Sequence, residues 1–165
     1  MVFDLPVLTL IHVVLSVVGI CAGLVVVGGL IAGERLDGWI GLFLSTTLLT
    51  NVTGFGFPFR VLLPSHIVGG LSLVILPLSI AARYWKHLTG SWRQVFVVTA
   101  VLALYFNVFV LLVQLFQKVP LLIVVAPTQK SPVFAVTQVL ILLLFVALGR
   151  AAVNGFRTDR PAAGG

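Results

Sequence analysis

The chain alternates between long apolar stretches and short polar connections. Apolar residues dominate five stretches, at 5–32, 39–57, 64–83, 95–117 and 133–153. Each stretch is close to the ~20 residues that a helix rising ~1.5 Å per residue needs to cross ~30 Å of hydrocarbon. The pattern therefore predicts an all-α integral membrane bundle of five transmembrane helices. It forms one domain over residues 1–153, followed by a flexible cytoplasmic tail at 154–165.

Composition supports a membrane environment. Hydrophobic residues make up 60% of the 165 residues and charged residues only 8%, whereas about a quarter of an ordinary soluble domain is charged. A soluble fold could not cover its surface with so few charges. The lipid bilayer is thus the first predicted partner.

The basic residues predict an orientation, because Lys and Arg in short loops are retained on the cytoplasmic side. With five spans, one side of the membrane receives Arg35, Arg83, Lys86, Arg93, Arg150, Arg157 and Arg160. The other side receives only Arg60, Lys118 and Lys130. The N-terminus is therefore predicted outside and the C-terminus inside. Aromatic residues that favour the headgroup layer lie at the same cytoplasmic ends, at Trp39, Tyr84, Trp85 and Trp92.

The net charge of +6 does not indicate a nucleic-acid partner. The basic residues are scattered among short loops, and most flank helix ends, where anionic lipid is the expected counter-charge. Cys21 is the single cysteine, so the chain has no internal disulfide and no thiolate pair for a metal.

Strongly polar side chains inside the spans are the candidates for a site, because the hydrocarbon offers them no hydrogen-bond partner. Counted from the outer ends, five fall in the outer half of the bilayer and Asn107 lies near the middle; the five are His12, Asn51, His66, Gln114 and Gln138. Such a layer predicts either a cavity open to the exterior or a satisfied network that locks the helices together.

Glycines at helical spacing predict close helix packing, since they let another backbone approach. Gly19 and Gly23 share a helix face with His12, and the four-residue spacing recurs further along; the glycines assigned to packing are Gly19, Gly23, Gly29, Gly33, Gly69 and Gly70. Pro77 lies inside the third span, where it should bend the helix and free the carbonyl of Leu73.

The pattern offers little for catalysis. The four acidic residues, Asp4, Glu34, Asp37 and Asp159, all fall in termini or connections, so no buried carboxylate is available as a general base. His12 and His66 could ligate a haem b iron or share another metal ion, although two histidines without a third strong ligand make a weak zinc or copper site. The chain is therefore expected to be non-enzymatic.

Four short segments resemble a group of small uncharacterised bacterial inner-membrane proteins with several spans. These are RLDGW at 35–39, TGFGFP at 53–58, LPSHIVG at 63–69 and FQKVPL at 116–121. The resemblance implies the bacterial cytoplasmic membrane and a helical bundle, and it carries no functional residue.

Three functions stay open from the sequence. The first is a binding or accessory protein that packs against itself or a larger membrane complex through its glycine-lined faces. The second is a haem b or metal-binding electron-transfer or assembly factor that uses His12 and His66. The third is a facilitator of a small neutral solute.

Overall fold

The computed structural model describes residues 5–57 and 64–156, and all regular secondary structure in these ranges is helical. The elements are α1 (Leu5–Ala32), α2 (Asp37–Gly54), α3 (Pro64–Ile80), the π-helix η1 (Ala81–Trp85), α4 (Trp92–Lys118), α5 (Pro120–Val125) and α6 (Pro132–Gly155). The predicted all-α class is confirmed for this part of the chain. The tail from residue 157 on, Arg60 and the side chain of His66 lie outside the described residues.

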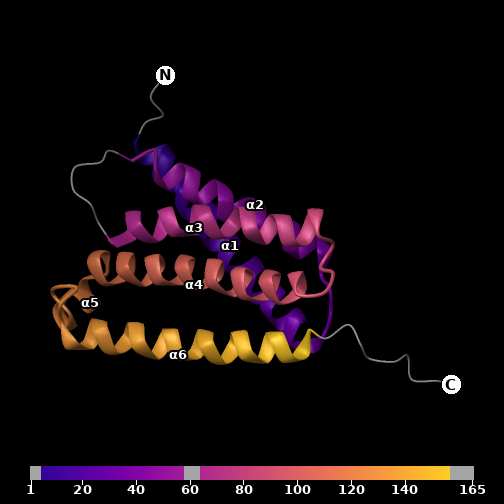
Figure 1. Cartoon of the computed structure of the whole chain (residues 1–165). Helices are drawn as coiled ribbons and strands as arrows, with labels where there is room; N and C mark the ends of the chain where they lie inside the picture. Colours follow the sequence, from indigo (N-terminus) through magenta and orange to yellow (C-terminus); the bar gives the residue numbers. More distant parts are fainter. Residues whose placement is uncertain (1–4, 58–63, 157–165) are drawn as a thin grey trace.

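Helices α3, α4 and α6 run back and forth along one common direction, while α1 and α2 are inclined to them (Figure 1). Each long helix runs opposite to the long helix before it. The start of α1 and the end of α6 therefore lie at opposite ends of the bundle.

Four helices within the described residues are long and apolar enough to cross a membrane: Pro6–Ala32, Ile67–Trp85, Trp92–Lys118 and Pro132–Gly155. The helix α2 is not one of them, although its 18 residues would extend about 27 Å. Its hydropathy is reduced by a run of Ser, Thr and Asn residues between Ser45 and Thr53. Most of these turn inward, because Thr46, Thr47, Thr50 and Asn51 are buried.

The helix ends differ from the predicted stretches by up to three residues, with one change of helix type. Helix α2 covers Asp37–Gly54 instead of 39–57, and α4 begins at Trp92 instead of 95. Polar residues at the membrane surface still form helical hydrogen bonds, so α2 and α4 begin two to three residues before their apolar stretches. The third stretch continues past Pro77 and changes to a π-helix at Ala81. Helix α6 extends to Gly155 and includes the first residues of the predicted tail.

Apolar side chains from α1, α2 and α4 fill the end of the bundle where α1 and α6 finish. Phe43, Phe96 and Leu104 are each at most 1% exposed there. Gly23 makes this packing possible, since a Cβ on it would lie 2.7 Å from Leu104 Cδ1 and 2.8 Å from Phe43 Cε2. Gly155 permits a still closer approach, because a Cβ there would overlap the backbone of Ile31.

The other predicted packing glycines have different surroundings. A Cβ on Gly19 would lie 3.1 Å from Thr46 Oγ1, and one on Gly29 would lie 2.7 Å from Leu36 Cδ1. Gly33 has φ +77°, a left-handed conformation that glycine adopts readily at a helix end. Gly69 lies at ordinary contact distance from Phe55, and Gly70 has no described atom within 4 Å of a Cβ position.

An ion-pair cluster joins the start of α2 to η1. Asp37 Oδ1 lies 2.6 Å from Arg83 Nη2 and 2.9 Å from Arg35 Nε. Desolvation tends to raise the pKa of the Asp37 carboxyl, but the hydrogen bonds and charges of Arg35 and Arg83 outweigh it and hold the pKa below its ordinary value. The Arg83 side chain is only 10% exposed, so Asp37 compensates a largely buried charge.

The segment between α4 and α6 folds back onto the bundle. The short helix α5 begins at Pro120, and its residue Leu122 packs against a small apolar cluster. This cluster consists of Val113, Phe116, Ala126 and Phe134. The rings of Phe116 and Phe134 meet edge to face, with centroids 5.4 Å apart. This cluster connects α4 to α6 at the end of the molecule opposite the ion pairs (Figure 1).

Candidate polar cavity among four helices

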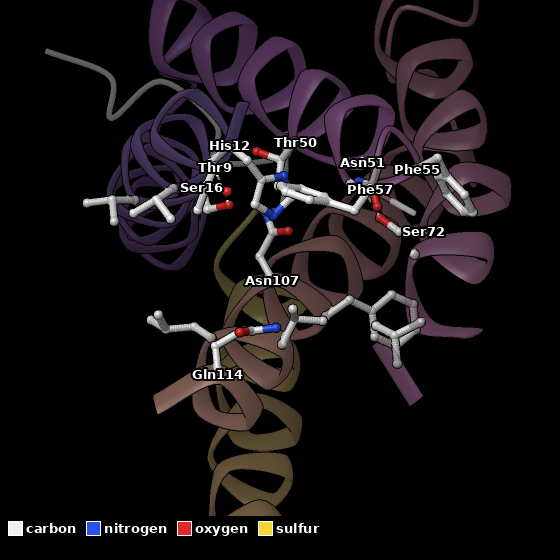
Figure 2. Close-up of a pocket in the computed structure, with 18 of the residues that line it drawn as sticks. Thr9, His12, Ser16, Thr50, Asn51, Phe55, Phe57, Ser72, Asn107 and Gln114 are labelled. Atoms are coloured by element: carbon white, nitrogen blue, oxygen red, sulfur yellow. Dashed lines mark hydrogen bonds between the residues drawn. The ribbon is translucent and has the colours of Figure 1, made fainter. Parts of the chain in front are cut away.

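A cavity of about 760 Å³ lies between α1, α2, α3 and α4. Its polar lining consists of Thr9, His12, Ser16, Thr50, Asn51, Ser72, Asn107, Gln114 and Lys118. Figure 2 shows the labelled side chains approaching one space from different helices. A volume of this size is typical of sites for small organic ligands.

Helical periodicity explains why these residues share one space. Thr9, His12 and Ser16 recur at three- and four-residue steps along α1, which places them on one face. The same spacing on α4 aligns Asn107, Gln114 and Lys118 through Leu111. Each helix therefore turns a polar stripe toward the cavity and leaves apolar side chains on its other faces.

Helix α2 holds this part of the bundle together by hydrogen bonds to two other helices. Asn51 Nδ2 donates to the Thr47 carbonyl at 2.8 Å and to Ser72 Oγ of α3 at 3.1 Å. Asn107 Nδ2 of α4 donates to Thr47 Oγ1 at 3.2 Å. In an apolar surrounding each such bond avoids the cost of an unpaired polar group.

His12 is fixed against the last turns of α2. Its Nδ1 lies 3.0 Å from Thr53 Oγ1, while the Thr53 hydroxyl donates its own proton to the Leu49 and Thr50 carbonyls. This contact joins the imidazole of α1 to the Thr53 hydroxyl of α2. The ring of Phe57 meets the imidazole edge to face, with centroids 5.4 Å apart.

Several polar atoms of the lining keep unused hydrogen-bonding capacity. Thr50 Oγ1 has no partner within residues 5–57 and 64–156, but it is fully buried and therefore not accessible from the cavity. In the same ranges no hydrogen bond reaches the amide oxygen of Asn107 or the amide group of Gln114. The lining is therefore only partly satisfied by contacts between the helices, which leaves groups free for a guest molecule.

The structure brings together four of the six polar residues that the sequence singled out, namely His12, Asn51, Asn107 and Gln114. Gln138 does not line the cavity. It lies on α6, where both of its amide atoms are buried without a partner among the described residues. His66 belongs to the first turn of α3, but its side chain, and with it the predicted His12–His66 haem or metal pair, lies outside the described part of the structure.

Five polar residues of the lining were not predicted from the sequence: Thr9, Ser16, Thr50, Ser72 and Lys118. Spacing would have indicated two of them, since Ser72 follows Gly69 by three residues and Lys118 follows Gln114 by four. Lys118 is the single charged residue among the described lining residues, and it lies at the α4 terminus. Phe55 and Phe57 contribute aromatic surface to the lining.

No group of three or more His, Cys, Asp or Glu residues converges within the described part of the chain. Comparison with protein-family models, characterised proteins and solved structures finds no match to this chain.

Proposed function

We propose that this chain is a non-enzymatic polytopic membrane protein that binds a small amphiphilic molecule in the polar cavity. The observation that carries the proposal is the partly satisfied lining, in which the amide oxygen of Asn107 and the amide group of Gln114 have no hydrogen-bond partner among the described residues. The ligand presents hydrogen-bonding groups to this lining and an apolar part to Phe55, Phe57 and the surrounding aliphatic side chains.

The packing favours binding over conduction of a solute through the bundle. Beyond the cavity, Phe43, Leu104 and Phe96 fill the space between the helices and are almost inaccessible. The cavity thus ends against an apolar floor, and a passage to the other end of the molecule would need these side chains to separate. Gly19 and Gly23 pack within the chain, so they are not needed for association with another protein.

In the proposed topology α2 also crosses the membrane, which gives five spans, an external N-terminus and a cytoplasmic C-terminus. The polar face of α2 is compatible with crossing because it is turned into the bundle. The end that carries Arg35, Arg83 and Arg150 would then face the cytoplasm, and the cavity would lie in the outer half of the bilayer. The proposed location is the bacterial cytoplasmic membrane.

The test compares two Ser→Phe variants after purification in mild detergent. Ser16→Phe fills the cavity, whereas the control Ser45→Phe adds the same ring at an exposed position of α2. We expect organic extraction and mass spectrometry to find a small molecule in wild type and Ser45→Phe at near-stoichiometric amounts, and at least tenfold less in Ser16→Phe. Absence of any bound molecule from folded wild type, or equal amounts in the three proteins, would contradict the proposal.

A visible absorption spectrum of the same samples distinguishes the proposed ligand from haem, the alternative ligand. If the protein binds the proposed molecule and no haem, its spectrum should lack a Soret band. A Soret band that disappears in His12→Ala would replace the proposal by haem binding.

A further inference from the structure

A second hollow lies on the opposite side of α4, between this helix and α6. It has a volume of about 340 Å³ and is lined almost entirely by apolar residues: Val98, Val101, Leu102, Tyr105, Leu142, Phe145, Val146, Gly149 and Val153, with Arg150 and Asn154 at one end. No residue is shared with the polar cavity. This α4–α6 groove is therefore a separate feature of the surface.

The groove has a floor and open edges. Val101 and Phe145 are each 5% exposed and form the floor, whereas Val98 and Val146 at the edges are each 46% exposed. Gly149 keeps the hollow open, because a Cβ there would lie 3.5 Å from Val101 Cγ1 and would raise the floor. Tyr105, whose ring packs 5.5 Å from that of Phe145, lies at the end away from Arg150.

The dimensions match one hydrocarbon chain. From Leu142 to Asn154 the groove follows α6 for about 18 Å, close to the ~15 Å thickness of one leaflet's hydrocarbon. A helix of the same length, with a diameter of about 10–12 Å, would occupy several times the volume of this hollow.

The charge lies where a lipid headgroup would lie. Arg150 is exposed near the end of α6, and both ion pairs of the described residues involve Asp37, so no carboxylate in the described ranges pairs with Arg150. An Arg at the membrane surface attracts anionic headgroups and can bind a phosphate through two N–H donors. Asn154 adds an amide donor at the same end of the groove.

We propose that the α4–α6 groove binds one anionic phospholipid, with an acyl chain along Val101, Phe145 and Gly149 and the phosphate at Arg150. The site is independent of the proposed function, because it uses other residues and requires no ligand in the polar cavity. It gives the protein a preference for anionic over zwitterionic lipid.

The experiment measures lipid binding to the full chain in detergent by native mass spectrometry, with phosphatidylglycerol and phosphatidylcholine of identical acyl chains as the probes. Wild type should bind one phosphatidylglycerol about fivefold more tightly than phosphatidylcholine. Arg150→Gln should remove this preference and Arg150→Lys should retain part of it. The control Lys130→Gln, which removes an equal charge at the other end of the molecule, should leave the preference unchanged.

A second pair of variants tests the apolar part of the site. Val146→Trp obstructs the groove and should weaken binding of both lipids, whereas Leu143→Trp adds the same ring to an exposed position outside the groove and should not. Equal binding of the two lipids to wild type, or an equal effect of Arg150→Gln and Lys130→Gln, would overturn the proposal. It would also be overturned if Val146→Trp changed the oligomeric state and left lipid binding intact, since the occupant would then be a second copy.

Discussion

Hydrogen-bond partners distinguish the polar residues of this bundle from one another. Hydroxyl groups return their protons to the preceding turn of their own helix, as Thr99 does to the Val95 carbonyl at 2.7 Å and Thr137 to the Val133 carbonyl at 2.8 Å. Carboxamides require more partners than their own helix supplies. Asn51 and Asn107 consequently connect helices, and their remaining capacity faces the cavity.

The sequence predicted which residues require partners, but not which partners they find. Residue type and helical spacing were sufficient to single out His12, Asn51 and Asn107. The pairing of Asn107 with Thr47 depends on the rotation of two helices about their axes, which the pattern of one helix does not determine. Gln138 illustrates the same limit, because α6 packs so that this side chain lies away from the cavity.

Gly23→Ala tests the close packing of α1 against α2 and α4. The added Cβ would lie under 3.0 Å from Leu104 and from the ring of Phe43, and the resulting overpacking should lower the free energy of unfolding by roughly 1–2 kcal/mol. Thermal denaturation in detergent measures this as a fall of several degrees.

Gly28→Ala is the matched control on the same helix, since no described atom lies within 4 Å of its Cβ position. Alanine is the better helix former, so this variant should be stabilised by roughly 0.5–1 kcal/mol. A fall in melting temperature of equal size for the two variants would show that α1 does not cross α2 and α4 at Gly23.

Helix α2 shows how one element differs from its sequence average. Its mean hydropathy is lower than that of the four other long helical segments, and it is too low to identify a membrane span. The structure shows that most of its polar residues, Thr46, Thr47, Thr50 and Asn51, are buried, and that hydrogen bonds connect the helix to α1, α3 and α4. An average cannot separate polarity turned toward a bundle interior from polarity turned toward water or lipid.

The turn after η1 was not predicted from the sequence. His87 and Leu88 have φ of 49° and 58°, a left-handed conformation that is unfavourable for residues with a Cβ. Leu88 is buried at 5% exposure, and its N–H donates to the Ala82 carbonyl at 3.0 Å. The burial of Leu88 and its backbone hydrogen bond therefore compensate for the unfavourable conformation. Because this compensation depends on tertiary packing, the local sequence does not predict the turn.

The ion pair between the start of α2 and η1 predicts a dependence of stability on pH. Because the pKa of Asp37 is lower in the folded than in the unfolded chain, its contribution is fully present above its ordinary pKa of 3.8 and is lost as the pH falls through the folded value. At neutral pH Asp37→Asn should lower the free energy of unfolding by roughly 0.5–1 kcal/mol, since Asp37 is largely exposed and solvent screens the pair.

Melting curves between pH 6 and pH 3 check this prediction. The difference between wild type and Asp37→Asn should shrink as the pH falls below about 4. Glu34→Gln removes a nearby carboxylate that has no ion pair among the described residues, and it should not reproduce the effect. A difference that stays constant over this range would mean that the charge of Asp37 contributes nothing.

For the molecule as a whole, polar and apolar regions are separated along the bundle. The polar cavity lies toward the end where α1 begins and α4 finishes, and the tightly packed apolar core lies toward the end where α1 and α6 finish. The latter end also carries the Asp37 ion-pair cluster and Arg150. This polarity is what the proposed topology requires, with the cavity toward the exterior and the basic residues toward the cytoplasm.

The sidedness of the two ends of α2 tests the central claim most directly, because the cavity lies within a membrane bundle only if α2 crosses. Single cysteines are introduced as Gly38→Cys and Gly56→Cys after Cys21→Ala removes the native thiol, and a membrane-impermeant maleimide is applied to intact cells and to inverted vesicles. We predict labelling of Gly56→Cys in intact cells and of Gly38→Cys only in inverted vesicles. Labelling of both cysteines from the same side would contradict the five-span bundle and the location of the cavity within it.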